Sequence, residues 1–208
     1  ENNASVTVTI TDNNSTVSRT VTADTSGNWT ISGSELDVSA FNNGTLTVSA
    51  TQTDTAGNTS TVATQNITLD NAAPSALTMT TPIETDGIVN AAEDNDVLIA
   101  GSGAEAGNSV TVTITDNNSS VSRTVTADTS GNWTISGSEL DVSAFNNGTL
   151  TVSATQTDTA GNTSTVATQS ITLDNTAPSA PSISTPIDID NIVNASEDDT
   201  LFILVCGA

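Results

Sequence analysis

A long internal repeat constrains this chain more than any other feature of its sequence. Residues 5–71 recur as residues 109–175, at a shift of 104 positions. The two copies differ only at the pairs Thr16/Ser120 and Asn66/Ser170. Self-similarity at a fixed period is the signature of a protein built from stacked modules. We therefore expect these 208 residues to come from a tandem array, and the parent protein to carry many copies.

Within the repeat, apolar and polar residues alternate as they do in strands with one buried face. In SVTVTITD (109–116), Val110, Val112 and Ile114 alternate with Thr. Thr and Val dominate these segments, and their stiff, branched side chains suit a pleated surface. Gly, Asn and Asp cluster between the segments, as expected for turns. Comparable strand patterns occupy residues 121–127, 132–136, 149–157 and 163–173.

Short strands at this spacing predict an all-β fold: Ig-like β-sandwich modules in tandem, each with about seven strands and Greek-key connections. Two further strands are expected near residues 77–81 and 96–101. Trp133 and Phe145 are expected to fill the core. The only segment that favours a helix is SELDVSAF (138–145), with one or two turns.

The sequence APSA at 73–76 and 177–180 predicts the joints between modules. One complete module then spans 73–176, while 1–72 holds the last five strands of a module and 177–208 the first two strands of the next. Because the number of antiparallel strands is odd, the N-terminus and the C-terminus of a module should lie at opposite ends of the sandwich. The incomplete modules should expose strand edges and apolar surface. We therefore predict head-to-tail self-association, in which 177–208 of one molecule completes 1–72 of another.

Composition excludes several classes of function. The chain has 24 carboxylates against two basic residues, Arg19 and Arg123, and a formal net charge of -22. Nucleic-acid binding requires clustered Lys and Arg, and no apolar stretch approaches the roughly 20 residues that cross a bilayer. Without His or Lys, the usual general bases and amine nucleophiles are missing. We expect no enzyme, no nucleic-acid partner and no membrane insertion.

The residues TVSATQTDTAGNTSTVATQSITLDNTAPSAP, together with GNWTISGSELD, resemble the bacterial Ig-like repeats of giant cell-surface adhesins. These include biofilm-associated proteins and the extender region of an ice-binding adhesin. The resemblance covers nearly the whole chain. It implies an extracellular location on the bacterial cell surface, a role as spacer between the cell and distal binding domains, and calcium at or near module junctions.

The acidic loops are the expected calcium sites, because Ca²⁺ takes six to eight oxygen ligands from carboxylates, amides and carbonyls. Strand parity sorts these loops to the two ends of the complete module. At the incoming end, a junction site would combine Asp70, Asn71, Glu105 and Asp158. At the outgoing end, the densest acidic stretch would supply Glu84, Asp86, Asn90, Glu93, Asp94 and Asp96, beside Asp116 and Asp174.

A simpler interpretation stands beside the metal hypothesis. Asp in DTAGN and DTSGN is also a common turn former, whose carboxylate accepts hydrogen bonds from nearby backbone amides. Asp116 could likewise mark only a hairpin. The last segment also departs from the repeat: Thr200 stands in the place of Asp96 and Val205 in that of Gly101. This change weakens the expectation of metal there.

The sequence thus predicts a structural extender whose modules are tied to neighbouring repeats of the same chain and stiffened by Ca²⁺. The alternative is a module that binds a glycan or ice directly through a Thr-rich β face. Thr is also simply a good residue for an exposed strand position. A carboxylate-pair hydrolase has only the abundance of Asp and Glu in its favour.

Overall fold

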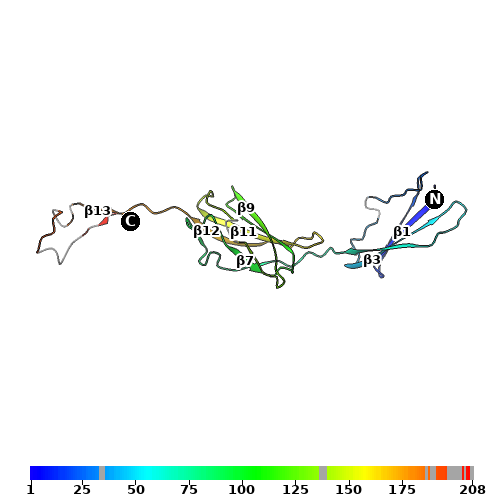
Figure 1. Cartoon of the computed structure of the whole chain (residues 1–208), viewed down its shortest axis with the longest axis horizontal. Helices are drawn as coiled ribbons and strands as arrows, with labels where there is room; N and C mark the ends of the chain where they lie inside the picture. Colours follow the sequence, from blue (N-terminus) through cyan, green and yellow to red (C-terminus); the bar gives the residue numbers. More distant parts are fainter. Residues whose placement is uncertain are drawn as a thin grey trace. The chain divides into compact units, whose positions relative to one another are not determined.

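The computed structural model describes residues 1–32, 36–135, 140–185, 187, 191–195, 203 and 205–206. The chain divides into two compact units (Figure 1). Unit 1 comprises Glu1–Ser75 and Gln156–Thr165, and unit 2 comprises Ala76–Thr155 and Val166–Ala208. The described residues form strands, turns and loops, and none forms a helix long and apolar enough to cross a membrane.

Unit 2 is built on two sheets that enclose one core. The smaller sheet has the order β10-β7-β5, and the larger has the order β6-β12-β11-β8-β9. The chain therefore crosses between the sheets from β5 to β6, from β6 to β7, from β7 to β8, from β9 to β10 and from β10 to β11, which makes an Ig-like sandwich. The strands are β5 (Thr78–Met79), β6 (Ile88–Asn90), β7 (Ile99–Ser102), β8 (Ser109–Thr115), β9 (Ser120–Thr126), β10 (Trp133–Ile135), β11 (Gly148–Thr157) and β12 (Ala167–Asp174).

The core lies between the two sheets, as the alternating pattern predicted. Val110, Val112 and Ile114 of β8 are completely buried. They pack in one cluster with Trp133 of β10, and Phe145 packs against its edge. The prediction that Trp133 fills the core is confirmed, whereas Phe145 is only partly buried. Complete burial of a Val or Ile side chain stabilises a fold by about 1.5–3 kcal/mol.

A contact between Gly101 and Trp133 closes the smaller sheet over this core. The two residues are partners across the β7–β10 ladder. A Cβ atom on Gly101 would overlap both the indole ring and the carbonyl oxygen of Thr78. The indole Nε1 is buried and has no hydrogen-bond partner in the described structure. Trp133 is therefore held by its packing on Gly101 and not by a polar contact.

The seven predicted strands are all present, but β6 is an additional one. It lies within the acidic loop and pairs in parallel with β12, with Ile88 opposite Thr172 and Asn90 opposite Asp174. A strand of three residues is too short to show an alternating pattern, which is why the sequence did not reveal it.

The predicted helix over 138–145 is wrong in its described part, residues 140–145. Leu140 and Val142 are both buried in the core, which is the two-residue spacing of an extended segment and not that of a helix. The Leu140 carbonyl accepts from Val97, and the N–H of Val142 donates to the Asp94 carbonyl. A single turn follows, and residues 138–139 lie outside the described residues.

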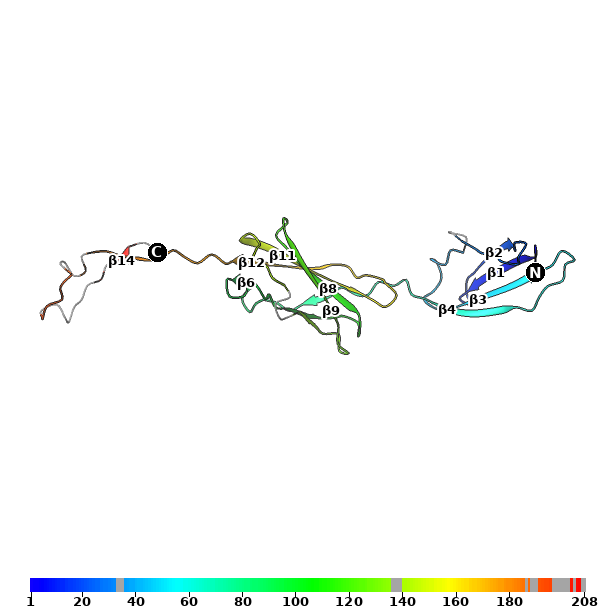
Figure 2. The same ribbon diagram turned by 45° about the horizontal axis from the view of Figure 1, so that its top comes forward.

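Unit 1 contains the counterparts of β8, β9, β11 and β12, and its described residues form no second sheet. Its strands are β1 (Ser5–Thr11), β2 (Thr16–Thr22), β3 (Gly44–Thr53) and β4 (Ala63–Leu69). They lie side by side in the order β2-β1-β3-β4 (Figure 2). The register is the same as in unit 2: Val8 faces Arg19 as Val112 faces Arg123.

Of the five strands predicted in residues 1–72, four are present among the described residues. Residues 29–31 correspond to β10, yet they form no strand. In unit 2 this segment pairs only with β7, and unit 1 has no counterpart of β7 among its described residues. An extended segment without a neighbour has no ladder to join, so identical residues adopt different structures in the two units.

Two short strands lie near the end of the chain, β13 (Ser182–Ile183) and β14 (Val205–Cys206). Ile183 faces Val205, as Met79 faces Gly101 in unit 2. The lead-in segments of the two repeats thus share one pairing register. Thr200, where the sequence departs from Asp96, lies outside the described residues.

The Gly101 contact gives a stability prediction. We expect Gly101→Ala to lower the free energy of unfolding by about 1–3 kcal/mol, the usual cost of forcing an extra carbon into a packed core. Urea denaturation followed by circular dichroism measures this loss. Ser102→Ala is the matched control, because Ser102 is exposed in the same strand. Equal stability of both variants would contradict the proposed packing.

Candidate functional site

The acidic loop of residues 84–96 directs its carboxylates toward backbone amides. The Leu98 N–H donates to Glu84 Oε1, and the Ile88 N–H donates to Asp86 Oδ1 at 2.8 Å. The Asn90 N–H donates to Glu93 Oε2 at 3.1 Å. These bonds hold the loop in shape and leave each carboxylate with further lone pairs.

The loop meets the end of β12, as strand parity predicted for the outgoing end. Asn90 is the strand partner of Asp174, and the side chain of Asn175 donates to Asp94 Oδ2 at 3.0 Å. Asp94 is buried. Its polar contact with Asn175 therefore offsets part of the cost of removing a carboxylate from water.

Asp116 reaches the same end of the module through two neighbouring asparagines. Asp116 Oδ2 accepts from the backbone N–H and from the side chain of Asn146, both at 3.1 Å. The adjacent Asn147 donates from its side chain to Asp174 Oδ1 at 3.3 Å. A chain of polar contacts thus joins Asp116 to Asp174.

Sequence reasoning missed the asparagines that connect these carboxylates, Asn146, Asn147 and Asn175. These asparagines lie in the sequence motifs FNNGT and LDN. We interpreted FNNGT only as a turn, because Asn is common in loops, and LDN entered the prediction only through Asn71 of the first copy. Their distant partners follow from the fold and not from local sequence.

At the incoming end, Asp158 organises its own turn. Its Oδ1 accepts from the N–H groups of Ala160 and Asn162, both at 2.9 Å. The side chain of Asn162 donates to Asp158 Oδ2 at 2.9 Å and to the backbone carbonyl of Asp70 at 3.2 Å. The turn and the segment around Asp70 are therefore in contact within unit 1.

The other residues of the predicted junction site point to local partners. Asp70 Oδ1 accepts from the side chain of Asn43 at 3.1 Å, and the Asn71 N–H donates to Asn43 Oδ1 at 3.1 Å. Glu105 belongs to unit 2, where its Oε2 accepts from the Asn108 side chain at 3.3 Å.

No three acidic, histidine or cysteine side chains among the described residues come together as a group that could hold a metal ion. Asp116, Asp128 and Asp158 instead accept hydrogen bonds from the N–H groups of their own turns. The simpler interpretation of these residues as turn formers is therefore confirmed. Whether any of them also binds metal stays a prediction.

Hydrogen bonding lowers the pKa values of the turn carboxylates. The N–H of Ser119, followed by that of Asn146, lowers the pKa of Asp116 from 3.8 to about 2. Ser15 and Asn42 do the same for Asp12 in the first copy. N–H donors stabilise the charged form of a carboxylate and so depress its pKa.

Outward Thr residues on the larger sheet pair with one another. The hydroxyls of Thr111 and Thr124 lie 2.9 Å apart, as do those of Thr113 and Ser122. Such cross-strand pairs stabilise a sheet by themselves. The Thr-rich pattern therefore does not require a glycan or ice as its explanation.

A second candidate site is the open face of unit 1. We use this name for the core-facing side of the β1–β4 sheet with Trp29. Trp29 is 44% exposed, whereas Trp133 is 2% exposed, and Ile67 is 45% exposed, whereas Ile171 is 3% exposed. The members of each pair occupy equivalent positions of the repeat. Unit 1 thus exposes Trp29 and Ile67, whose equivalents are buried in the core of unit 2, while Val6, Val8 and Leu46 stay buried in both copies.

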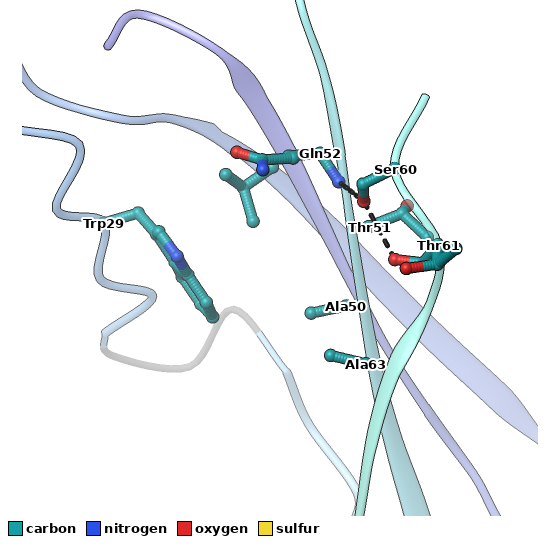
Figure 3. A pocket seen from close by; sticks show the side chains of 8 residues that line it. Trp29, Ala50, Thr51, Gln52, Ser60, Thr61 and Ala63 are labelled. Carbon is teal, nitrogen blue, oxygen red and sulfur yellow. Dashed lines mark hydrogen bonds between the residues drawn. The ribbon is translucent and has the colours of Figure 1, made fainter. Parts of the chain in front are cut away.

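The open face carries a shallow pocket of about 340 Å³. In Figure 3, Trp29 stands on one side of it, and Ala50 and Ala63 lie on the strands opposite. On its far side, the Gln52 N–H donates to the Ser60 hydroxyl at 3.1 Å. The pocket is apolar near the tryptophan and polar near this bond.

A family model described as bacterial Ig-like domain matches residues 1–71 and 78–175. This chain belongs to the bacterial Ig-like domain family. The two matches cover both copies of the repeat, and the second extends through the lead-in segment as well. The all-β sandwich predicted from the sequence is thus confirmed. No match was found among curated proteins.

Several solved structures are similar to this Ig-like chain. One is a tetra-tandem repeat from the extending region of a large adhesion protein, with 28% identity over 93% of this chain and 47% of that one, at a TM-score of 0.42. Another is a Ca²⁺-stabilized adhesin that helps an Antarctic bacterium reach out and bind ice, with 29% identity over 93% and 46%, at 0.45. A third is a 1.5-MDa bacterial ice-binding adhesin, with 26% identity over 95% and 62%, at 0.40.

The chain spans about half the length of the first two structures and less than two thirds of the third. All three TM-scores lie below 0.5, so the superpositions do not support an inference about function. Membership of the bacterial Ig-like family rests on the family match.

The low pKa of Asp116 gives a pH prediction for these Ig-like modules. Its folded-state pKa lies below its ordinary value of 3.8, so its stabilising effect is present above about pH 4 and is lost as the pH falls through about 2. We expect the thermal midpoint to drop over this range. Asp116→Asn keeps an acceptor but cannot titrate, and should flatten the drop.

Asn118→Ser serves as the control for this measurement. It changes the same turn but keeps the backbone N–H that donates to Asp116. Its pH profile should follow that of the unmodified chain. A profile of Asp116→Asn as steep as that of the control would contradict the assignment.

Proposed function

We propose that these bacterial Ig-like modules are a structural extender of a cell-surface adhesin, located outside the bacterial cell. One observation carries the proposal: the path of the chain along β11. The side chain of Gln156, near one end of β11, donates to the carbonyl of Ser75 just before β5. Asn147, just before the other end, donates to Asp174 at the end of β12.

The chain therefore reaches the module beside one end of β11 and leaves it beside the other. With ten residues in β11 and a rise of about 3.3 Å per residue, this path advances the chain by about 30 Å. Each copy of a near-identical repeat would extend the chain by this distance, so an array of such copies would act as a spacer. Neighbouring repeats of the same chain are then its natural partners.

The side-chain chemistry favours the same role over catalysis. The chain has no His or Lys, and aromatic residues make up only 2% of it. Binding pockets for small molecules are usually lined by apolar and aromatic side chains. Repulsion among 24 carboxylates would favour an extended array over a collapsed one.

We further propose that Ca²⁺ stiffens the array at the ends of the modules. At the outgoing end, Glu93, Asp94 and Asp174 with the amide oxygen of Asn90 would supply the ligands; at the incoming end, Asp158 and the segment around Asp70 would do so. Carboxylate and amide oxygens are the donors that Ca²⁺ prefers. The residues fit this ion by donor type. To close around it, the carboxylates would exchange hydrogen bonds such as that between Asn175 and Asp94 for metal contacts.

Bound calcium would supply positive charge that cancels the repulsion between these carboxylates. A ligand that binds only the folded state stabilises it by about 2.7 kcal/mol at a concentration of 100 times its dissociation constant. Extracellular calcium is millimolar, so even a weak site would be filled. Modules that share ligands across a joint would lose freedom of bending there.

A calcium titration tests this role. We expect the thermal midpoint of the chelated chain to rise by several degrees in millimolar calcium, since about 1 kcal/mol raises it by roughly 4–8 °C in a domain of this size. The double variant Asp94→Asn with Asp174→Asn should lose most of the rise. Asp37→Asn, in an isolated turn, should keep it.

Differential scanning calorimetry in chelator and in calcium provides the measurement. The same midpoint in both solutions would contradict calcium stabilisation. An equal loss in the control and in the double variant would contradict the placement at the outgoing end.

A further inference from the structure

Both basic side chains of this acidic chain lie in the middle of strands, whereas the carboxylates lie in turns and loops. Among the strands that the structure describes, the only charged residues are Arg19, Arg123 and Asp174. Asp174 is the last residue of β12, but each arginine is the central residue of a strand of seven, β2 or β9. A chain with a net charge of -22 thus has its two basic residues at one position of the repeat.

The strand of Arg123 forms a long open edge of the sandwich. The smaller sheet of unit 2 ends in β10 and β5, and the larger sheet ends in β6 and β9. Three of these edge strands have only two or three residues, whereas β9 has seven. An edge strand presents unpaired N–H and C=O groups to which another chain can add, and a very short edge offers few of them. Of these four edges, β9 is therefore the one most open to pairing.

Arg123 lies on the core-facing side of this edge strand. Its partner across the ladder is Val112, which is completely buried, and directly opposite residues share one face of a sheet. Its neighbours on that face, Val121 and Val125, pack against the core. Arg123 itself is exposed, and its guanidinium donates to the Ser122 carbonyl at 2.9 Å. A charge therefore interrupts the apolar face of this strand.

We propose that Arg123 prevents the edge of β9 from pairing with β9 of a second copy of this chain. The partner that fits this edge is the same strand in the antiparallel direction. The other six residues of β9 are all Ser, Val or Thr, and such uncharged, proline-free segments favour addition to a sheet edge. A charged residue that points inward on an edge strand is a known means of blocking that addition.

Arg123 opposes each register in which two β9 strands could pair. Because it is the central residue of β9, in the fully paired antiparallel register it would face Arg123 of the second chain. Like charges directly opposite each other destabilise paired strands. A shift of two residues would place the guanidinium opposite Val125, where burial of an unpaired charge is costly. A shift of one residue would turn the valines of the added strand to the wrong face.

A basic residue suits this position better than a carboxylate. Asp and Glu are disfavoured in strands, and a further negative charge would add to the repulsion within a chain of net charge -22. The stem of an arginine can lie along apolar surface while its guanidinium stays in water. The single chain therefore tolerates Arg123 beside Val121 and Val125, whereas a paired edge would not.

Removal of the charge from the intact chain tests the proposal. We expect Arg123→Val to self-associate with a dissociation constant at least about tenfold lower than that of the unmodified chain, equivalent to about 1.4 kcal/mol. Sedimentation velocity over a range of concentrations measures the constant. Valine favours strands, so the dilute variant should keep the thermal midpoint of the unmodified chain in circular dichroism. Arg123→Lys keeps the charge and should associate no more than the unmodified chain.

Hydrogen exchange locates the contact, and the first copy of the repeat supplies an internal control. In Arg123→Val, protection of the β9 amides should rise with protein concentration, because an added strand binds the free edge. The amides of β2 should not change, since β2 keeps Arg19. Peptides from the two strands differ in mass at Thr16 and Ser120. Protection that appears at β2 or on other strands, and not at β9, would overturn the proposal.

Thr124→Val is the matched control for the gain of a valine. Thr124 is the next residue of the same strand, but its hydroxyl lies 2.9 Å from that of Thr111 on the other face of the sheet. This variant keeps Arg123 and should associate no more than the unmodified chain. Equal association of Arg123→Val and either Thr124→Val or the unmodified chain would overturn the proposal. Arg123→Thr removes the charge with a residue already present in β9, and decides the question if Arg123→Val has a lowered thermal midpoint.

Discussion

The packing of Trp133 on Gly101 is the contact that makes a closed sandwich out of this sequence. It joins β10 to β7 and so completes the smaller sheet over the core. The repeat supplies its own control, because Trp29 has the same neighbours in sequence but no β7 to pack against. There the strand that would be β10 does not form, and Trp29 and Ile67 become exposed. The residues shared by the two copies are therefore not sufficient to form a closed sandwich, and the lead-in segment is a structural part of the module.

The repeat thus divides its structural roles between two parts. The strands β8 to β12 come from the nearly invariant part of the repeat, whereas β5, β6 and β7 come from the more variable lead-in segment. The lead-in segment also carries the acidic loop that meets β12 at Asp174. Closure of the core and assembly of the outgoing acidic end thus depend on the same stretch of chain. A change in that stretch would therefore affect both the stability of the module and the proposed calcium binding.

Much of the fold could be predicted from local pattern, and the failures have physical causes. The position of β8 could be predicted because Val110, Val112 and Ile114 alternate with polar residues, which is typical of a half-buried strand. Leu140 and Val142 were assigned to a helix, since their burial depends on contacts with residues 94–97 that local sequence does not show. Strand parity predicted that the acidic loop of residues 84–96 lies beside Asp174, and Asn90 is the strand partner of Asp174. The asparagines that link them, such as Asn147, could not be found, because their partners are far away in sequence.

Native-state hydrogen exchange on the intact chain tests the central claim most directly, since it compares the two copies in one sample. Protection reports the local free energy of opening. If closure by the lead-in segment organises the module, the amides of Trp133 and Ile135 should exchange far more slowly than those of Trp29 and Ile31. Equal protection at the two pairs would contradict the account, because the same residues would then be ordered without their cover.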